Sequence, residues 1–164
     1  MKIAVIGLTA GGRNLAHHLA DQLDAELLER QQQKFAAVIA ENWQQYDAFI
    51  CIMATGIVIR AIAPLLNDKA VDPCVLVLDE KGKNVISLLS GHLGGGNALT
   101  LNVARLLDAN PVITTASDTL KLTALDLWAQ ENRLVPPARP ALTALSARLV
   151  NSGRLLCYCD TGIT

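Results

Sequence analysis

The sequence predicts an α/β fold, a three-layer sandwich built around a mostly parallel sheet. Short apolar runs rich in β-branched residues alternate with segments whose apolar residues recur at helical spacing. This alternation is typical of parallel strands joined by helices that cover both faces of a sheet. Two neighbouring runs, residues 74–78 and 85–89, are separated by a polar turn that contains Gly82. These two runs could form one antiparallel hairpin within the sheet.

The strands are predicted from short apolar runs that turn residues bound on either side. The clearest run reads Asp-Ala-Phe-Ile-Cys-Ile-Met at residues 47–53 and ends at Thr55-Gly56. Gly82 lies between two later runs, where a tight turn would need a positive φ. In chain order, we expect strands at residues 2–6, 25–28, 47–53, 74–78, 85–89, 111–114 and 155–159.

The helices are predicted where apolar residues recur every three or four positions. Pro64 should end or kink the third helix, because proline lacks the amide hydrogen that a helix interior needs. The first helix carries Leu15, Ala16, Leu19 and Leu23 on one face. Later helices are expected at residues 35–42, at 57–63, from the loop at 90–97 to about 107, at 124–131 and at 141–150.

The length of 164 residues is enough for one domain with a substantial core and for part of a second. Pro136, Pro137 and Pro140 interrupt the alternation of strands and helices late in the chain. We therefore expect an α/β domain over residues 1–120. Residues 121–164 are expected to be the start of a connecting region that is truncated here.

The composition favours a soluble globular protein over a nucleic-acid or membrane protein. Hydrophobic residues make up 51% of the chain and the formal net charge is −1, so no basic surface for nucleic acid is expected. The longest apolar runs fall far short of the roughly 20 residues that a helix needs to cross a bilayer. We therefore expect neither a nucleic-acid partner nor a membrane span; the cysteines, described next, favour a cytoplasmic location.

No metal site is expected. His17 and His18 are adjacent on the first helix, so they point in different directions and are poorly placed to share a metal. The cysteines also lack metal-ligand spacing and fit structural roles in a reduced compartment. They are Cys51, Cys74, Cys157 and Cys159.

Four turns that follow predicted strands carry the candidate binding residues. Ligands of open α/β sheets bind beyond the carboxyl ends of the strands, where helix N-termini favour anions. We expect one site there, for a ligand that bears carboxylates or phosphates. The turns are residues 7–12, 54–56, 90–97 and 114–118. The candidate binding residues are Thr55, Gly56, Arg60, Ser90, Gly91, Gly94, Gly95, Asn97, Thr114, Thr115 and Asp118.

The first of these turns does not match a nucleotide-binding fingerprint. Thr9 stands where Gly-x-Gly-x-x-Gly requires its middle glycine, and no Gly-Lys-Ser/Thr follows as in a P-loop. The turn either contacts a ligand or packs its helix tightly against the sheet, and both interpretations stay open. A Rossmann-like nucleotide binder is therefore the least favoured alternative.

Residues 90–97, Ser-Gly-His-Leu-Gly-Gly-Gly-Asn, are the most informative segment, and we call them the glycine-histidine loop. Its three consecutive glycines would cost about 1 kcal/mol each inside a helix, so the backbone is expected to approach something closely. His92 could be catalytic, because an imidazole gains and loses a proton near neutral pH. It could also serve as a capping or hydrogen-bonding residue. For Asp79 and Asp118, turn and capping roles are favoured.

Two segments of the chain carry a resemblance to a known family. The pattern Ser-Gly-His-x-Gly-Gly-Ala/Gly-Asn fits the glycine-histidine loop, and Pro-Val-Ile-Thr-Thr-Ala-Thr/Ser-Asp fits residues 111–118. Both patterns are those of the cobalamin-biosynthesis protein CbiG family, which the chain resembles. Residues 53–60, Asp72-Pro73 and residues 124–129 are similar to further blocks of that family. The resemblance covers most of the chain.

The resemblance implies a role in anaerobic cobalamin synthesis, as part of a cobalt-precorrin-5A hydrolase. Such an enzyme opens the δ-lactone of its substrate and releases a two-carbon fragment as acetaldehyde, giving cobalt-precorrin-5B. No separate cofactor is implied, since the substrate carries its own cobalt. Family members continue through a linker into a C-terminal domain, so the activity of this chain alone is an open point.

His92 is the catalytic residue of our hypothesis. Its imidazole would activate water for lactone opening, or would accept the hydroxyl proton as the acetaldehyde leaves. A hypothesis from a different class is a non-catalytic module that binds the corrinoid, or helps to assemble the enzyme, while another domain performs the chemistry.

Overall fold

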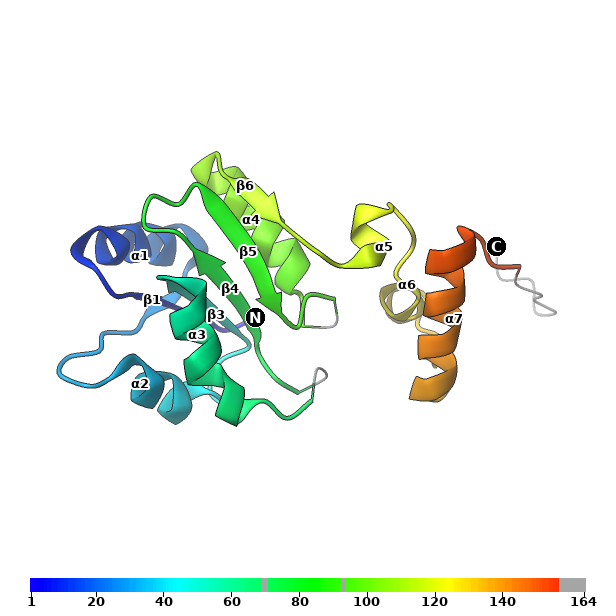
Figure 1. The fold of residues 1–164 in the computed structure, drawn as a ribbon, viewed down its shortest axis with the longest axis horizontal. Coiled ribbons are helices and arrows are strands. Elements are labelled where there is room, and N and C mark those ends of the chain that lie inside the picture. Colours follow the sequence, from blue (N-terminus) through cyan, green and yellow to red (C-terminus); the bar gives the residue numbers. More distant parts are fainter. Residues whose placement is uncertain (69–70, 93, 157–164) are drawn as a thin grey trace. The chain divides into compact units, whose positions relative to one another are not determined.

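The computed structural model describes residues 1–68, 71–92 and 94–156. The chain forms two compact units, Met1–Ile113 and Thr114–Thr164 (Figure 1). The boundary expected after residue 120 falls inside the second of these units. All strands that the structure describes belong to the first unit.

The strands of the first unit join in one six-stranded sheet, and the predicted mixture of parallel pairs and one hairpin is confirmed. In chain order they are β1 (Ile3–Gly7), β2 (Glu26–Leu27), β3 (Ala48–Ile52), β4 (Cys74–Leu78), β5 (Asn84–Leu89) and β6 (Asn110–Val112). The order across the sheet is β2-β1-β3-β4-β5-β6. The pairs from β2 to β4 are parallel, β4 and β5 are antiparallel, and β6 runs parallel to β5.

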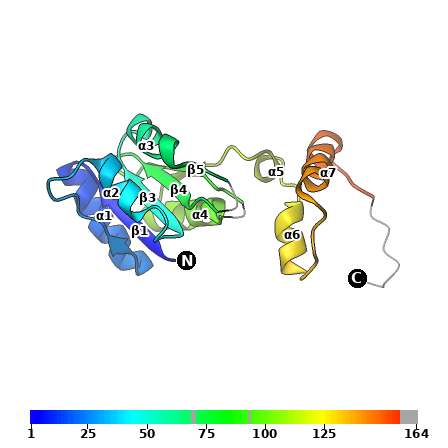
Figure 2. The same ribbon diagram turned by 90° about the horizontal axis from the view of Figure 1, so that it is seen from below.

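Helices cover both faces of the sheet and complete the predicted three layers (Figure 2). They are α1 (Ala10–Leu23), α2 (Phe35–Asn42), α3 (Thr55–Ile62) and α4 (Gly96–Leu107). One buried cluster contains apolar residues of α2 and α3, and the other contains apolar residues of α1 and α4. Pro64 lies in a 3₁₀ turn, Ala63–Leu65, directly after α3, so its predicted effect on the helix end is confirmed.

Successive residues of the central strands face opposite sides of the sheet, so each strand contributes side chains to both buried clusters. In β1, Ala4 and Ile6 face the α2–α3 side, whereas Val5 faces the α1–α4 side. All residues of β3 and β4 are buried, which explains why those runs are apolar at every position. Cys51 and Cys74 are buried in these strands as free thiols. Burial raises the pKa of the Cys51 thiol to about 12 and that of the Cys74 thiol to about 11.

The short turn between β4 and β5 reverses the direction of the last two strands. Gly82 adopts the left-handed conformation there (φ 63°), as its position predicts. The Asp79 carboxylate accepts hydrogen bonds from the backbone amides of Lys81, Lys83 and Asn84, at 3.0, 3.3 and 2.7 Å. Partial burial raises the pKa of Asp79. These three hydrogen bonds, with a fourth from the side-chain amide of Asn84 at 3.1 Å, outweigh that effect and lower the pKa below its ordinary value. The carboxylate therefore belongs to the turn.

The second unit contains α5 (Ala116–Thr119), α6 (Leu125–Glu131) and α7 (Arg139–Ser152). The last two were expected from the sequence, but the single turn α5 was not. Residues 155–156 show no regular structure, and the rest of the strand expected at 155–159 lies outside the described residues, as do Cys157 and Cys159. Across the described ranges, no helix is both long and apolar enough to cross a bilayer.

Candidate functional site

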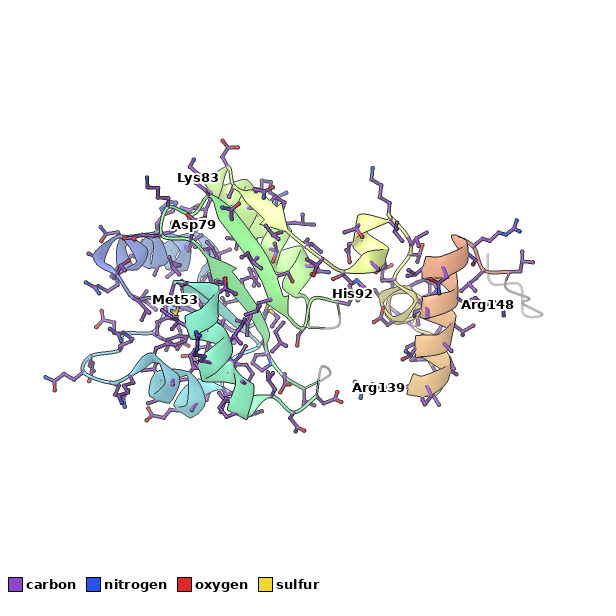
Figure 3. The ribbon with its side chains drawn as sticks, viewed as in Figure 1. Met53, Asp79, Lys83, His92, Arg139 and Arg148 are labelled. Atoms are coloured by element: carbon purple, nitrogen blue, oxygen red, sulfur yellow. The ribbon has the colours of Figure 1, made fainter. Side chains whose placement is uncertain are left out.

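The predicted site residues of the first unit lie at opposite edges of the sheet. Thr55, Gly56 and Arg60 follow β3, at the carboxyl edge of β1 to β4. Because β5 runs the other way, Leu89 pairs beside Val75, and the glycine-histidine loop begins at the amino edge of those strands. Figure 3 shows Asp79 and Lys83 at one end of the β4–β5 hairpin and His92 at the other. The expectation of one shared cleft is therefore wrong.

The glycine-histidine loop is tied to the segment that precedes β4. The hydroxyl of Ser90 donates a hydrogen bond of 3.0 Å to the carbonyl of Asp72. Asp72 is buried, with 7% of its surface exposed, and its carboxylate accepts the backbone amide of Asn67 at 2.9 Å. Ser90 itself has a positive φ of 52°, which is uncommon outside glycine. These contacts fix where the loop leaves β5.

Asn97 closes the loop from the other side. The residue is 5% exposed, and its Oδ1 accepts a hydrogen bond of 2.7 Å from the hydroxyl of Ser87 on β5. Its backbone amide donates to the carbonyl of Gly91 at 2.8 Å. A buried amide held in this way positions the loop, and it offers little surface to a substrate.

The loop glycines are required by packing inside the loop. A Cβ on Gly94 would lie 2.6 Å from both Cβ and the carbonyl oxygen of Ser90. A Cβ on Gly91 would lie 2.5 Å from Oδ1 of Asn97. Gly95, the residue before α4, has a φ of 76°, where side chains are strained. The close approach predicted from the glycines is thus made by the loop to itself.

His92 occupies the middle of this constrained segment. Its carbonyl accepts the backbone amide of Gly95 at 2.9 Å, which closes a tight turn around it. The residue as a whole is half-buried. The loop therefore presents one titratable side chain from a backbone that is held at both ends, at Asp72 and at Asn97.

A pocket of about 410 Å³ lies at the opposite, carboxyl edge of β1, β3 and β4. Thr9, Thr55, Asp79, Glu80 and Asn84 supply its polar lining. The sheet order changes direction between β1 and β3, and open α/β sheets bind ligands at such a point. Thr55 is thus the one predicted binding residue that lines this pocket.

The first glycine turn is occupied by the protein's own carboxylate. Thr9 caps α1 by accepting the amide of Gly12 at 3.0 Å, and its hydroxyl donates to Oε1 of Glu80 at 3.0 Å. A Cβ on Gly11 would lie 2.5 Å from that same oxygen. Glu80 therefore lies where an anion would meet the start of α1. This arrangement favours the packing interpretation of residues 7–12 and disfavours a nucleotide phosphate.

Arg60 and Gly56 interact with each other. Nη1 of Arg60 donates to the carbonyl of Gly56 at 2.8 Å, one turn back along α3. Arg60 is exposed and lies outside the lining of the carboxyl-edge pocket. The arginine is therefore placed on the surface of its own helix.

Thr114, Thr115 and Asp118 belong to the second unit. Thr115 is the residue before α5, and Asp118 lies in that helix, where its carbonyl accepts the amide of Lys121 at 3.1 Å.

Three positioning residues were missed by the sequence reasoning. Ser87 has a detectable signal, because a hydroxyl stands at a central position of an apolar strand. Asp72 and Glu80 have no such signal in the sequence, because an acidic residue before a proline or in a turn is usually expected on the surface. Among the described residues, no group of three His, Cys, Asp or Glu side chains lies close enough together to hold a metal ion.

Comparison with known proteins gives relatives of one kind. The chain is 42% identical to a cobalt-precorrin-5A hydrolase of Salmonella typhimurium over 173 aligned positions, which cover 99% of the chain and 49% of the relative. It is 45% identical to a cobalt-precorrin-5A hydrolase of Priestia megaterium over 120 positions, which cover 73% of the chain and 32% of the relative. The chain thus spans half or less of these relatives.

The fold also matches a solved structure. A homolog of cobalamin biosynthesis protein G from Sulfolobus solfataricus superposes with a TM-score of 0.61 over 92% of this chain and 46% of that protein, at 21% identity. The family model described as cobalamin synthesis G N-terminal matches residues 37–118, half of the chain, including the whole glycine-histidine loop. The chain therefore belongs to the cobalamin synthesis G N-terminal family.

Proposed function

We propose that this chain is the N-terminal part of a cobalt-precorrin-5A hydrolase. The observation that carries the proposal is the glycine-histidine loop, which lies inside the family match and holds His92 on a backbone fixed at both ends. The relatives that bear this enzyme name support the same activity. Cys51 and Cys74 are buried free thiols, which fits the reduced, cytoplasmic location that is part of the proposal.

His92 is the proposed acid–base residue of the reaction. A water molecule adds to the lactone carbonyl and the ring C–O bond breaks, which leaves a carboxylate and a hydroxyl group. The hydroxyl then loses its proton, the adjacent C–C bond breaks, and acetaldehyde leaves while the bonding electrons pass to the macrocycle. Each step requires a group that takes up a proton near neutral pH, and imidazole is suited to that task.

The binding residues are proposed in two groups. Ser90, Gly91, Gly94 and Gly95 would present backbone groups to the substrate beside His92, with Asn97 as their support. Thr55, Gly56 and Arg60 lie at the other edge of the sheet, so they would contact a different part of a large substrate or of the complete protein. Thr114, Thr115 and Asp118 stay candidates on the second unit.

A non-catalytic corrinoid-binding or assembly role is the second candidate. It is favoured by the length of the chain, which spans 49% of the Salmonella relative, and by the loop glycines, which the packing of the loop already explains. In that case His92 would orient substrate for groups supplied elsewhere in the complete protein.

The decisive experiment follows acetaldehyde release from cobalt-precorrin-5A with this chain and with the complete protein. In the complete protein, His92→Ala should lower turnover by at least about 100-fold, since removal of a general acid–base group has effects of that order. His18→Ala, which removes an exposed imidazole from α1, is the matched control. Normal turnover by the His92→Ala variant would exclude the catalytic role. Binding of substrate by this chain without release would favour the corrinoid-binding role.

A further inference from the structure

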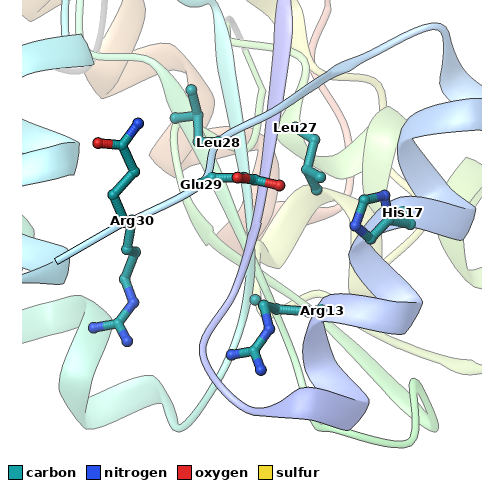
Figure 4. A pocket seen from close by; sticks show the side chains of 8 residues that line it. Arg13, His17, Leu27, Leu28, Glu29 and Arg30 are labelled. Carbon is teal, nitrogen blue, oxygen red and sulfur yellow. The ribbon is translucent and has the colours of Figure 1, made fainter. Parts of the chain in front are cut away.

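A second pocket, of about 270 Å³, lies at the outer end of the sheet, beside the carboxyl ends of β1 and β2. Figure 4 shows it from close by. Its charged lining comes from Arg13 and His17 on α1 and from Glu29 and Arg30 after β2. Gly7, Leu27, Leu28 and Gln31 complete the wall. The sequence did not single out the four charged residues, because they are separated by up to 17 positions and His17 was considered only as a metal ligand.

The fold holds the two arginines on either side of this pocket. Arg13 is anchored by a hydrogen bond of 2.8 Å from its Nη1 to the carbonyl of Leu8. The segment that carries Arg30 is fixed because the amide of Leu28 donates to the carbonyl of Val5 at 2.8 Å, beyond the last paired residue of β2. The pocket is therefore built on the edge of the sheet.

The pocket lining carries two arginines and one glutamate, and no ion pair joins them in the part of the chain that the structure describes. Neither arginine forms an ion pair there, and the ion pairs of that part involve Met1, Lys2, Glu26 and Asp47. Figure 4 shows both guanidinium groups directed to the same side, while the carboxylate of Glu29 lies away from them and nearer to His17. Two positive charges therefore share one concave surface in a protein whose net charge is −1.

We propose that this pocket binds an oxyanion, a carboxylate or phosphate group at the end of a ligand. The planar guanidinium fork matches the oxygen geometry of these two groups, and the imidazole of His17 adds a further donor. Ligand pockets that enclose a whole small molecule usually exceed about 300 Å³, so this smaller pocket suits one charged arm. It lies at the opposite edge of the sheet from the glycine-histidine loop, and the proposal does not depend on the proposed function.

The test titrates the isotope-labelled chain with two probes, inorganic phosphate and tricarballylate, and follows backbone amides and arginine side-chain signals by NMR at constant ionic strength. We expect saturable shifts at Gly7, Arg13 and Arg30. Arg30→Ala, which removes a side chain that makes no hydrogen bond in the described structure, should weaken binding about tenfold, the usual effect of losing one charge-assisted contact. Glu29→Gln should strengthen binding about twofold, because it removes an opposing charge.

Arg105→Ala is the matched control, since Arg105 is an exposed arginine of α4 that bonds to Asn102 at 2.9 Å. It removes the same charge from the same unit and should leave the affinity unchanged. Tighter binding of tricarballylate would identify an organic carboxylate as the ligand, and tighter binding of phosphate a phosphate group. The proposal is overturned if neither probe shifts these signals, or if Arg30→Ala and Arg105→Ala weaken binding equally.

Discussion

The hydroxyl of Ser87 lies 2.7 Å from the side-chain oxygen of Asn97, and this hydrogen bond joins strand β5 to the first turn of α4. The eight residues of the glycine-histidine loop connect the same two elements. The pair therefore helps to determine how the loop closes.

Asn97→Ala should lower the free energy of unfolding by about 1–3 kcal/mol, because it removes a buried side chain and leaves the part-buried Ser87 hydroxyl without its acceptor. Urea denaturation followed by circular dichroism measures the change. Asn102→Ala, on the same helix but partly exposed, is the control and should cost less than about 0.5 kcal/mol. Equal effects of the two substitutions would mean that the Ser87–Asn97 bond does not hold the loop.

Gly94→Ala should destabilise the chain by about 1–3 kcal/mol, because its Cβ would overlap the Ser90 backbone, and overpacking has this usual cost. Gly56→Ala is the comparison, since its Cβ would meet only the mobile end of the Arg60 side chain at 3.0 Å. Thermal melts of the two variants should separate clearly. If Gly94→Ala melts like Gly56→Ala, the loop has room that the packing distances do not suggest.

Asp79→Asn should destabilise the β4–β5 turn by about 1 kcal/mol at pH 7, since hydrogen bonds to a charged acceptor are replaced by weaker ones. The pKa of Asp79 is lowered by folding, so its contribution is present above its ordinary pKa of 3.8. That contribution is lost as the pH falls through the lower, folded-state value. The difference in unfolding free energy between wild type and variant should therefore shrink below about pH 4. A difference that stays constant from pH 7 to pH 2 would contradict this role.

Cys51 and Cys74 should resist alkylation in the folded chain. Burial raises both pKa values, to about 12 and about 11, and only the thiolate reacts. In a variant with Cys157→Ser and Cys159→Ser, iodoacetamide at pH 8 should label neither remaining thiol until urea unfolds the chain. Mass spectrometry counts the labels. Rapid labelling of either cysteine without urea would show that its strand opens readily.

Much of the fold could be predicted from the sequence because burial leaves a pattern of apolar residues. Strands buried on both faces are apolar at every position, and helices buried on one face are apolar at every third or fourth position. The fully apolar runs of β3 and β4 and the helical spacing of Leu15, Ala16 and Leu19 are examples. The short helix α5 was missed because four residues carry too little periodicity for a prediction.

The arrangement of the site was harder to predict because it depends on the direction of the strands. A polar turn such as residues 79–83 indicates a hairpin, but the position of β6 beside β5 depends on contacts across the sheet. The antiparallel pairing of β5 with β4 is what places the glycine-histidine loop at the edge opposite Thr55. The pocket between Arg13 and Arg30 depends on the pairing of β1 with β2, which two residues of β2 establish.

The antiparallel direction of β5 places His92 and the Arg13 pocket at opposite edges of the sheet, and this separation affects how the protein can evolve. A five-residue strand such as β4 is about 17 Å long, so Arg13 and His92 are separated by more than the distance over which substitutions usually influence each other. Changes at one edge should therefore add to changes at the other without epistasis. Selection could retune the oxyanion pocket while leaving the loop that carries His92 untouched.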